Sequence, residues 1–373
     1  MSKHTLRFYP LGNADTTLIS LANGKQILWD YAHMKAEGDE DDERCDLPKE
    51  LDKHVTGDFD IVTFTHADRD HIKCFSEYFY LKHAKKYQSD DRKKIKELWV
   101  PAAVLLDKQS EDEAKILKAE ARCRLRNKED ILVFSKPQKM KDWCDEQNDI
   151  SYDEVKHLFV DAGKLVPGIT LDDDGIEFFS HSPFQSENLN IDRNGEAIVV
   201  QATFDDQCKT KLILGSDCTS EIWERIVEVT RHFGNDERLS WDVFRVSHHC
   251  SYLSLSLEKG ADQTEPEDDI KWLFEDQGKI RSRLISSSKP IPIRGSEEDK
   301  DSQPPHRQAA SYYKELARDK KGEFLVTMEH KKNGKVTPIV MEIDKDDCAK
   351  VIKESSKKSS IYIGTKKPPR AGF

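Results

Sequence analysis

The chain has 373 residues, of which 35% are charged and 36% hydrophobic, and its net charge is −11. It contains no run of about 18 apolar residues and its first residues lack an apolar signal core, so we expect neither a membrane span nor a secretory signal. Eight cysteines are scattered without a Cys-x-x-Cys pair, which argues against a zinc ribbon or a disulfide framework and favours a reducing cytoplasm. Because the net charge repels phosphate, a nucleic-acid partner would need a local basic patch.

Two short apolar segments near the start, 4–10 and 16–21, are predicted strands on either side of a turn that contains Gly12, Asn13 and Asp15. Glycine and asparagine tolerate positive φ, so these residue types suit a turn. The functional alternative is that Asp15 or Asn13 faces an active site.

The most informative stretch follows a predicted buried strand over 60–65, rich in β-branched and aromatic residues. Four potential metal ligands come directly after it: His66, Asp68, Asp70 and His71. Side chains in a turn at the carboxyl end of a strand can converge on one point. Imidazoles and carboxylates both donate lone pairs to a divalent cation. A solvated acidic turn is the alternative, and the density of ligand types favours a metal site over it.

The order His66-x-Asp68-x-Asp70-His71 resembles the His-x-His-x-Asp-His signature of the metallo-β-lactamase fold. Asp68 stands where most members have the second histidine. This form is similar to the soluble domain of competence DNA-uptake (ComEC-type) proteins. The resemblance implies a mixed α/β (α+β) fold, an αββα sandwich of two sheets with helices outside and with charged helical and loop insertions.

Two further strand ends carry candidate site residues through this resemblance. The predicted strand 26–30 ends at Asp30, and such an aspartate commonly supports a metal-binding histidine in this fold through the second ring nitrogen. The segment 176–183 contains His181 at the place of the fold's third metal motif. The uptake branch often has a proline-containing turn there instead, and Pro183 fits that turn, so His181 stays open as a ligand.

Asp217 and a pair of histidines continue the resemblance. Asp217 follows an apolar strand and a Gly-Ser bend, as in the branch's Leu-Leu-Thr-Gly-Asp, and its two oxygens could bridge two metals. His248 and His249 follow another strand and resemble the branch's His-His-Gly-Ser, with Cys250 in place of the glycine. We expect His249 to complete the second metal site and His248 to support it or face the substrate.

The resemblance therefore implies two divalent metal ions. The first would be held by His66, Asp68, Asp217 and, if it is a ligand, His181. The second would be held by Asp70, His71, Asp217 and His249. Asp70, Asp217 and His249 are the expected catalytic residues. Because Asp68 makes the ligand set harder, manganese or magnesium competes with zinc.

We expect one hydrolase domain over residues 1–345, with insertions at about 84–160 and 252–305, and a flexible basic tail over 346–373. A highly charged helix is predicted over 107–130. Residues that could contact a nucleic-acid backbone are Arg122, Arg124 and Arg126 on this helix and Lys357, Lys358, Lys366, Lys367 and Arg370 in the tail. A solvated helix and a solubilising tail are the alternatives.

These motifs favour a metal-dependent hydrolase. Similarity to the DNA-uptake branch favours a phosphodiesterase or nuclease that uses a metal-activated water. This assignment of the substrate class rests on a fold-level analogy. One alternative is a hydrolase of a small ester, lactam or nucleotide. Another is a partner-gated effector subunit of a multi-protein system, for example in defence, which docks a protein partner through its basic tail or charged insertions.

Overall fold

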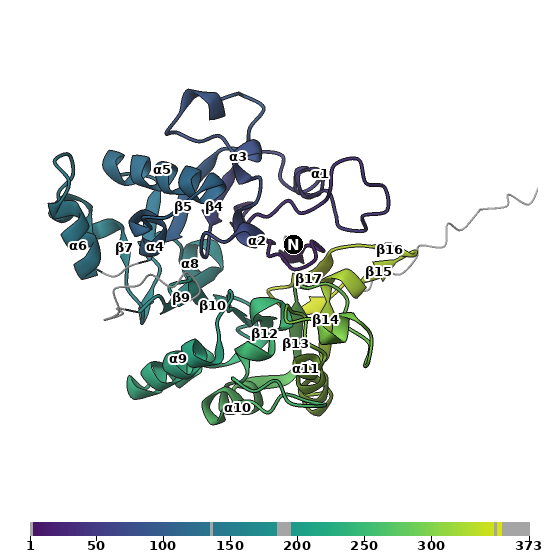
Figure 1. The fold of residues 1–373 in the computed structure, drawn as a ribbon. Helices are drawn as coiled ribbons and strands as arrows, with labels where there is room; N and C mark the ends of the chain where they lie inside the picture. The colour runs from purple at the N-terminus through teal and green to yellow at the C-terminus, as the bar shows by residue number, and fades with distance from the viewer. Residues whose placement is uncertain (1–2, 135–136, 185–194, 347–348, 353–373) are drawn as a thin grey trace, which may run out of the picture.

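Two β-sheets face each other in this protein, and helices cover the outer face of each sheet (Figure 1). The structure is a computed structural model that describes residues 3–134, 137–184, 195–346 and 349–352. The predicted fold class, a mixed α/β sandwich with helices outside two sheets, is confirmed by this arrangement.

The first sheet joins an antiparallel half to a parallel half. In order across the sheet, its nine strands are β18 (Lys350–Val351), β17 (Ile339–Ile343), β1 (His4–Phe8), β2 (Thr17–Ser20), β3 (Gln26–Trp29), β4 (Phe59–Thr63), β5 (Ile95–Pro101), β6 (Ile131–Phe134) and β7 (Phe159–Val160). The pairings from β18 to β3 are antiparallel, and those from β3 to β7 are parallel. The parallel strands need crossover connections, which contain helices in this sheet.

The second sheet has the same mixed character. In order, its seven strands are β14 (Glu323–Val326), β13 (Gly278–Ser286), β12 (Trp241–Val246), β11 (Lys211–Leu214), β10 (Val199–Phe204), β9 (Ile176–Ser182) and β8 (Lys164–Leu165). The pairings from β14 to β11 are parallel, and those from β11 to β8 are antiparallel. A separate hairpin of β15 (Lys331–Lys332) and β16 (Lys335–Val336) precedes β17.

The core between the sheets is built from the alternate apolar residues of their inner faces. Phe178 of the second sheet stacks on Trp29 of the first with ring centroids 5.8 Å apart, and it meets the edge of Trp99 at 5.5 Å. All three side chains are fully buried. Burial of such large aromatic surfaces fixes the two sheets against each other.

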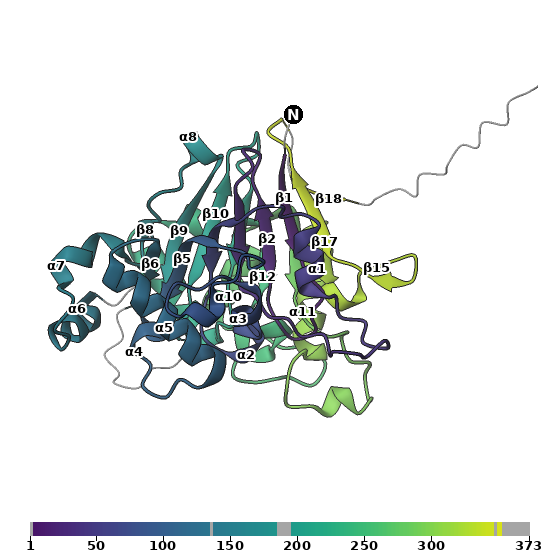
Figure 2. The ribbon, with the colours of Figure 1, turned by 90° about the horizontal axis from the view of Figure 1, so that it is seen from above.

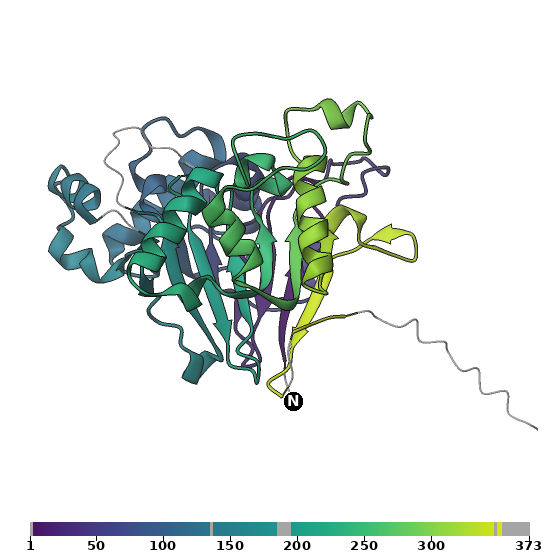
Figure 3. The same cartoon turned by 90° about the horizontal axis from the view of Figure 1, so that it is seen from below.

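Helices complete two outer layers, each with its own apolar core. On the first sheet lie α1 (Leu47–Asp52), α2 (Arg69–Ile72), α3 (Phe75–Tyr78), α4 (Ala102–Leu106), α5 (Asp112–Asn127), α6 (Pro137–Asp145) and α7 (Tyr152–Val155). On the second lie α9 (Ser220–His232), α10 (Asp268–Glu275) and α11 (Arg307–Asp319), which Figure 3 shows in front of its strands. Helix α8 (Leu171–Asp174) precedes β9.

Short 3₁₀ turns join several of these elements. They are η1 (Lys85–Tyr87), η2 (Lys156–Leu158), η3 (Asp236–Leu239), η4 (Ser247–Cys250), η5 (Tyr252–Ser254), η6 (Glu298–Lys300) and η7 (Thr327–Glu329). The turn η4 follows the carboxyl end of β12, and η6 lies in the long loop after β13.

The regions predicted as insertions are part of the two sheets. Residues 84–160 supply β5, β6 and β7, and residues 252–305 supply β13. The predicted tail also begins within the first sheet, because Lys350–Val351 pairs with β17. The five basic tail residues proposed for nucleic-acid contact lie outside the described residues.

The sequence predicted no disulfide framework, and the described cysteines are mostly free thiols: Cys45, Cys74, Cys123, Cys144, Cys218 and Cys250. Cys208, between β10 and β11, is nonetheless disulfide-bonded. Among the described helices none is long and apolar enough to cross a membrane.

Candidate metal centre

The carboxyl ends of β4, β11 and β12 meet at one end of the sandwich, and the predicted site residues follow these strand ends. Figure 2 shows α2, which follows β4, at the end of the strands opposite the amino terminus. Hydrogen bonds between the two sheets close this edge. Thr65 O accepts from Ile198 N at 3.0 Å, and Thr65 Oγ1 accepts from Ser216 Oγ at 3.0 Å. The turns after β4 and β11 are thereby held together.

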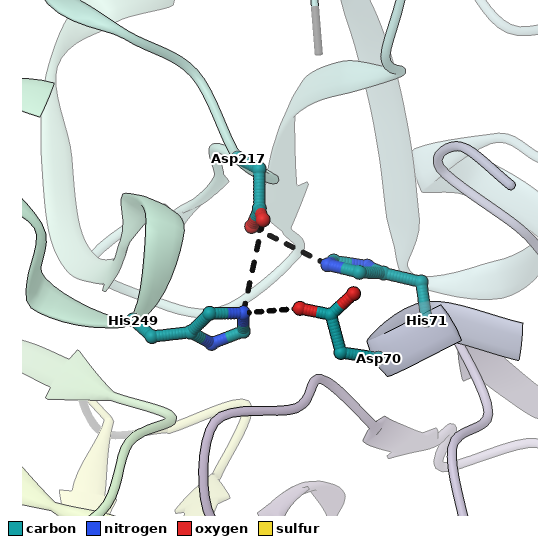
Figure 4. Close-up of side chains that lie close together, drawn as sticks. All are labelled: Asp70, His71, Asp217 and His249. Carbon is teal, nitrogen blue, oxygen red and sulfur yellow. Dashed lines mark hydrogen bonds and ion pairs between the residues drawn. The ribbon is translucent and has the colours of Figure 1, made fainter. Parts of the chain in front are cut away.

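Four of the predicted ligands form a compact cluster: Asp70, His71, Asp217 and His249 (Figure 4). One possible ligand atom from each lies within 4.8 Å of the others. Asp217 is central, with Oδ1 3.3 Å from His71 Nε2 and Oδ2 3.7 Å from His249 Nε2. His249 Nε2 is also 2.8 Å from Asp70 Oδ2. These four residues are the set that the sequence assigned to the second metal.

His66 lies beside this cluster, with its ring centroid 3.9 Å from that of His71. Its Nδ1 is 3.1 Å from Thr65 Oγ1, and its Nε2 is 3.7 Å from Asp68 Oδ2. Burial, together with the neighbouring imidazole of His71, lowers the pKa of His66, so the neutral, metal-binding form is favoured. The structure thus brings His66 and Asp68 to the edge of the cluster.

Asp30 makes the supporting contact predicted for it. Its Oδ2 lies 3.0 Å from His71 Nδ1, and its Oδ1 accepts from Thr65 N at 2.7 Å. The carboxylate is fully buried, and Asp30 has a left-handed φ of 58°. A carboxylate on Nδ1 fixes the tautomer of an imidazole and raises the basicity of the other nitrogen. Asp30 therefore leaves His71 Nε2 to face Asp217.

A fully buried arginine connects the second sheet to this edge, and the sequence interpretation missed it. Arg245 lies on β12 and donates from Nη2 to Asp15 Oδ2 at 2.8 Å, with Asp30 Oδ2 at 3.8 Å. Asp15 Oδ2 is also 3.8 Å from His71 Nε2, so Asp15 does face the cluster. A charged residue inside an apolar strand followed by two histidines was the available signal. The group of Asp15, Asp30 and His71 could also hold a cation, but the guanidinium already balances its carboxylates.

Asn13 has a different role from the one expected. Its Oδ1 accepts from Lys289 N at 3.0 Å, and its Nδ2 donates to Pro304 O. Both polar groups of the side chain are therefore used to hold the loop after β13. Of the two residues, Asp15 or Asn13, that the sequence offered as facing the site, Asp15 lies beside the cluster and Asn13 holds this loop.

The histidine pair occupies a strained turn. His248, His249 and Cys250 have φ of 49°, 52° and 67°, a left-handed conformation that costs about 1–3 kcal/mol for each such residue. His249 Nδ1 donates to Ser287 O at 2.8 Å, which leaves Nε2 for the cluster. The His248 ring lies 6.2 Å from that of His249 and outside the cluster. The structure thus brings His249 rather than His248 to the candidate ligands.

His181 is not brought to the cluster. Residues alternate in direction along β9, and Phe178 points into the core between the sheets, so His181 points outward to α9. Its Nε2 donates to Arg238 O at 2.9 Å, and its Nδ1 accepts from Thr230 Oγ1 at 3.4 Å. Burial lowers its pKa to about 4. With both ring nitrogens occupied, His181 is removed from the ligand set.

The pKa values of the carboxylates and imidazoles in the cluster depend strongly on one another. Burial alone would lower the pKa of His249, but the carboxylates of Asp217 and Asp70 raise it to about 9. Burial alone would raise the pKa of Asp217, but His249 and His71 lower it well below its usual range. Protons on the imidazoles therefore balance the carboxylates in the metal-free chain. A divalent cation could take over that balance.

Three buried polar atoms test whether a cation fits here. His66 Nε2, His71 Nε2 and Asp217 Oδ1 make no hydrogen bond of normal geometry within the described part of the chain. Other buried side-chain atoms share this property, but these three lie together beside candidate ligands. Imidazole nitrogens and carboxylate oxygens are suitable ligands for zinc or manganese. These buried Asp and His residues could hold a metal ion, although they do not identify it.

The three arginines predicted to contact nucleic acid are engaged within the fold. Arg122 donates to Leu105 O through Nε and Nη2, and Arg126 pairs with Asp149 at 2.8 Å. Arg124 is 1% exposed and binds Glu120 at 2.8 Å. All three side chains thus have partners within the fold, and their contact with a nucleic-acid backbone stays a prediction.

Comparison with known proteins assigns no family. No family model matches the chain, and no curated protein matches it. The argument about function therefore starts from the geometry of the cluster and from the residues that form it.

Proposed function

We propose that this protein is a metal-dependent hydrolase of the metallo-β-lactamase type that cleaves phosphodiesters. The observation that carries the proposal is the buried cluster of Asp70, His71, Asp217 and His249, with ligand atoms within 4.8 Å of one another. Its order along the chain and its position at strand ends fit the resemblance described above. The convergence of two carboxylates and two imidazoles on one buried point supports a bound cation there.

Each residue has a distinct task in this proposal. Asp70, His71, Asp217 and His249 would hold a divalent ion, and His66 and Asp68 beside them would help to hold a second. Two such ions supply Lewis acidity and lower the pKa of water, so that hydroxide is available near neutral pH. Asp30 and the Ser287 carbonyl orient the two imidazoles through their Nδ1 atoms. The carboxylate of Asp68 makes manganese or magnesium a competitor to zinc.

The proposed substrate is a small phosphodiester. Similarity to the DNA-uptake branch supports phosphodiester chemistry by analogy. The engaged arginines of α5 weaken the nuclease form of the proposal, because phosphate contacts supply most nucleic-acid affinity. Hydrolysis of a small ester or lactam is the second candidate. The arginines of α5 that are bound within the fold favour it, because such a substrate needs no contacts to a phosphate backbone.

The test uses purified protein stripped of metal and then loaded with Zn²⁺, Mn²⁺ or Mg²⁺. We expect hydrolysis of bis(4-nitrophenyl) phosphate that depends on the metal and is lost in Asp217→Ala. Labelled single- and double-stranded DNA and RNA, a 4-nitrophenyl ester and a chromogenic β-lactam are assayed in parallel. Absence of both metal binding and hydrolysis would reject the proposal, whereas cleavage of the ester or lactam alone would favour the second candidate.

A further inference from the structure

Arg245 is a fully buried cation in the strand that leads to the histidine pair. On β12, Val243 belongs to the core between the two sheets and Phe244 to the outer core beneath the helices of the second sheet. Because residues alternate in direction along a strand, Arg245 points between the sheets, as Val243 does. It extends to the turn between β1 and β2, where its Nη2 donates to Asp15 Oδ2 at 2.8 Å. A charge buried in this way requires a compensating partner.

Two carboxylates share this cation. Asp15 Oδ2 lies 2.8 Å from Arg245 Nη2, and Asp30 Oδ2 lies 3.8 Å from the same nitrogen. Both carboxylates are buried. In the described part of the chain, no other arginine and no lysine forms an ion pair with either of them. Without the guanidinium, two buried negative charges would share one possible cationic partner, His71, among the described residues.

Arg245 supplies a charge to these carboxylates more than it supplies a set of hydrogen bonds. A guanidinium carries several N–H donors in a fork that can bind both oxygens of one carboxylate. Among the described residues, only Nη2 of Arg245 has a hydrogen-bond acceptor in normal geometry, whereas Nε and Nη1 are buried without one. The fork is therefore not used to bind Asp15. What the side chain provides at this position is a buried positive charge.

The same two carboxylates belong to a group that could hold a metal ion of its own. Ligand atoms of Asp15, Asp30 and His71 lie within 4.8 Å of one another. His71 is shared with the cluster, because its Nδ1 is 3.0 Å from Asp30 Oδ2 and its Nε2 is 3.3 Å from Asp217 Oδ1. A metal ion between Asp15 and Asp30 would therefore compete with the cluster for His71. A guanidinium stays protonated in proteins, so Arg245 neutralises this group permanently.

We infer that Arg245 is a positioning residue that takes the place of a metal ion: it neutralises Asp15 and Asp30, so that they bind no metal of their own and His71 stays available to the metal at Asp217. The inference deepens the proposed function and rests on it for a bound divalent ion, but not for a substrate. Arg245 thereby limits the number of bound metal ions, in addition to connecting the two sheets.

The number of bound metal ions tests this inference without turnover. The metal-free full chain and its Arg245→Met variant are titrated with Mn²⁺, and bound ions are counted from the free Mn²⁺ signal in electron paramagnetic resonance. Methionine replaces the aliphatic part of arginine and leaves the place of the guanidinium open. We expect Arg245→Met to bind an additional Mn²⁺ ion per chain, and Asp15→Asn added to it to abolish that extra binding. Equal numbers of ions in Arg245→Met and wild type would overturn the inference.

Arg245→Lys and Arg124→Met are the matched controls. Arg245→Lys keeps the positive charge, so we expect the wild-type number of Mn²⁺ ions and an affinity within about tenfold of wild type. Arg124 is also buried and pairs with Glu120 at 2.8 Å, but it binds Ile95 O at the start of β5 rather than at a carboxyl end. Arg124→Met should lower stability and leave the number of Mn²⁺ ions unchanged. An additional ion in either control would overturn the inference.

A double variant keeps the inference testable if Arg245→Met alone does not fold. Arg245→Met combined with Asp15→Asn removes one charge of each sign, and replacing both members of a buried ion pair destabilises a protein far less than removing one. We expect the double variant to bind as many Mn²⁺ ions as wild type and to lose less than about 100-fold in affinity, as for a residue that only supports a ligand. An additional ion or a larger loss would overturn the inference, because Asp15 or Arg245 would then have a different role at the metal.

Hydrolysis of bis(4-nitrophenyl) phosphate separates this inference from the proposed function. An additional Mn²⁺ ion in Arg245→Met, without hydrolysis by the Mn²⁺-loaded wild type, supports the role of Arg245 and rejects the phosphodiesterase. Metal-dependent hydrolysis by the wild type, with equal numbers of Mn²⁺ ions in the two proteins, supports the proposed function and overturns the inference. An additional ion together with hydrolysis by the wild type supports both.

Discussion

The metal cluster and helix α5 are both rich in charged side chains, yet their hydrogen bonding differs. In the cluster, His66 Nε2, His71 Nε2 and Asp217 Oδ1 are buried without a hydrogen bond of normal geometry among the described residues. On α5, Arg122 donates to a backbone carbonyl and Arg124 and Arg126 pair with carboxylates. Arg126 Nε of α5 also lacks a hydrogen bond of normal geometry, although it lies 2.8 Å from Asp149. The difference is therefore one of arrangement: the helix uses its charges to hold its own neighbours, whereas the ligand atoms of the cluster converge within 4.8 Å of one another.

This difference shows why charge alone is a poor guide to function. A buried ion pair such as Arg124 with Glu120 is strongly destabilised when one partner is removed, so it can be essential without any ligand. Buried polar atoms without partners carry a desolvation cost that a bound cation could remove. The comparison therefore predicts large effects on metal binding at the cluster and none at α5.

Asp217→Ala should have the largest effect, because Asp217 faces both His71 and His249. We expect its metal affinity to fall by more than about 100-fold, beyond the loss typical of a residue that only supports a ligand. Metal content and calorimetric titration with Mn²⁺ measure this change. His181→Asn is the control, since it should lower stability by about 1–3 kcal/mol and leave metal content unchanged. Full metal loading of Asp217→Ala would contradict the cluster assignment.

Asp30→Asn should have an intermediate effect. The substitution keeps the size of the side chain but weakens its interaction with His71 Nδ1, and it leaves Arg245 with one carboxylate fewer. We expect a loss of about 10–100-fold in metal affinity, the usual range for such supporting partners. Asp60→Asn, at a half-buried position on β4, is the comparison variant and should bind metal normally. Equal affinities of the two variants would argue against a supporting role for Asp30.

The pH dependence of the metal-free protein should be smaller but measurable. The raised pKa of His249, about 9, means that its stabilising contribution is complete below its unfolded value of about 6.5. That contribution is lost as the pH rises through about 9. The lowered pKa of Asp217 contributes above about pH 4 and is lost in acid. We expect the metal-free Tm to be highest between about pH 4 and 6.5 and to fall by several degrees toward pH 9.

The stabilisation that metal adds should depend on pH in the opposite direction to the metal-free stability, because an imidazole must lose its proton to bind a cation. Stabilisation by Mn²⁺ should therefore increase between about pH 6.5 and 9, while the metal-free Tm falls. Thermal unfolding is recorded across this interval with a chelator and with Mn²⁺. A metal-free Tm that does not change with pH would show that the imidazoles are not charged.

Much of this arrangement was predictable because local sequence determines it. Strand ends place His66, Asp70, Asp217 and His249, and the sequence motifs identify those ends directly. The two-sheet sandwich was expected from the resemblance of these motifs to the metallo-β-lactamase fold, and the apolar segments between turns are consistent with its strands.

The remaining features depend on partners that are distant in the sequence. Arg245 is explained by Asp15, in the turn between β1 and β2, and by Asp30, which follows β3. The direction of His181 depends on which face of β9 meets the core, and spacing from the nearest turn does not fix this. The sequence does not show which groups bind the arginines of α5, because their acceptors, including Leu105 O and Asp149, lie outside the helix. Long-range pairing therefore explains both the missed residue and the partners of these arginines, which the sequence does not reveal.

The smallest effect is expected from Arg122→Gln combined with Arg126→Gln. Both side chains stack near Trp143 and bind groups of the fold, so their loss should lower stability by about 1–3 kcal/mol and leave metal binding and phosphodiester hydrolysis unchanged. Lys115→Gln, at an exposed position of the same helix, is the control, and the effects are compared for each positive charge removed. If α5 bound nucleic acid, the double variant would lower the affinity of the protein for DNA more than the control does. It would also flatten the dependence of log affinity on log salt by roughly 0.7 for each lost single-strand phosphate contact. Binding of labelled single-stranded DNA between about 50 and 200 mM salt distinguishes these outcomes, and we expect no difference in slope between the two variants.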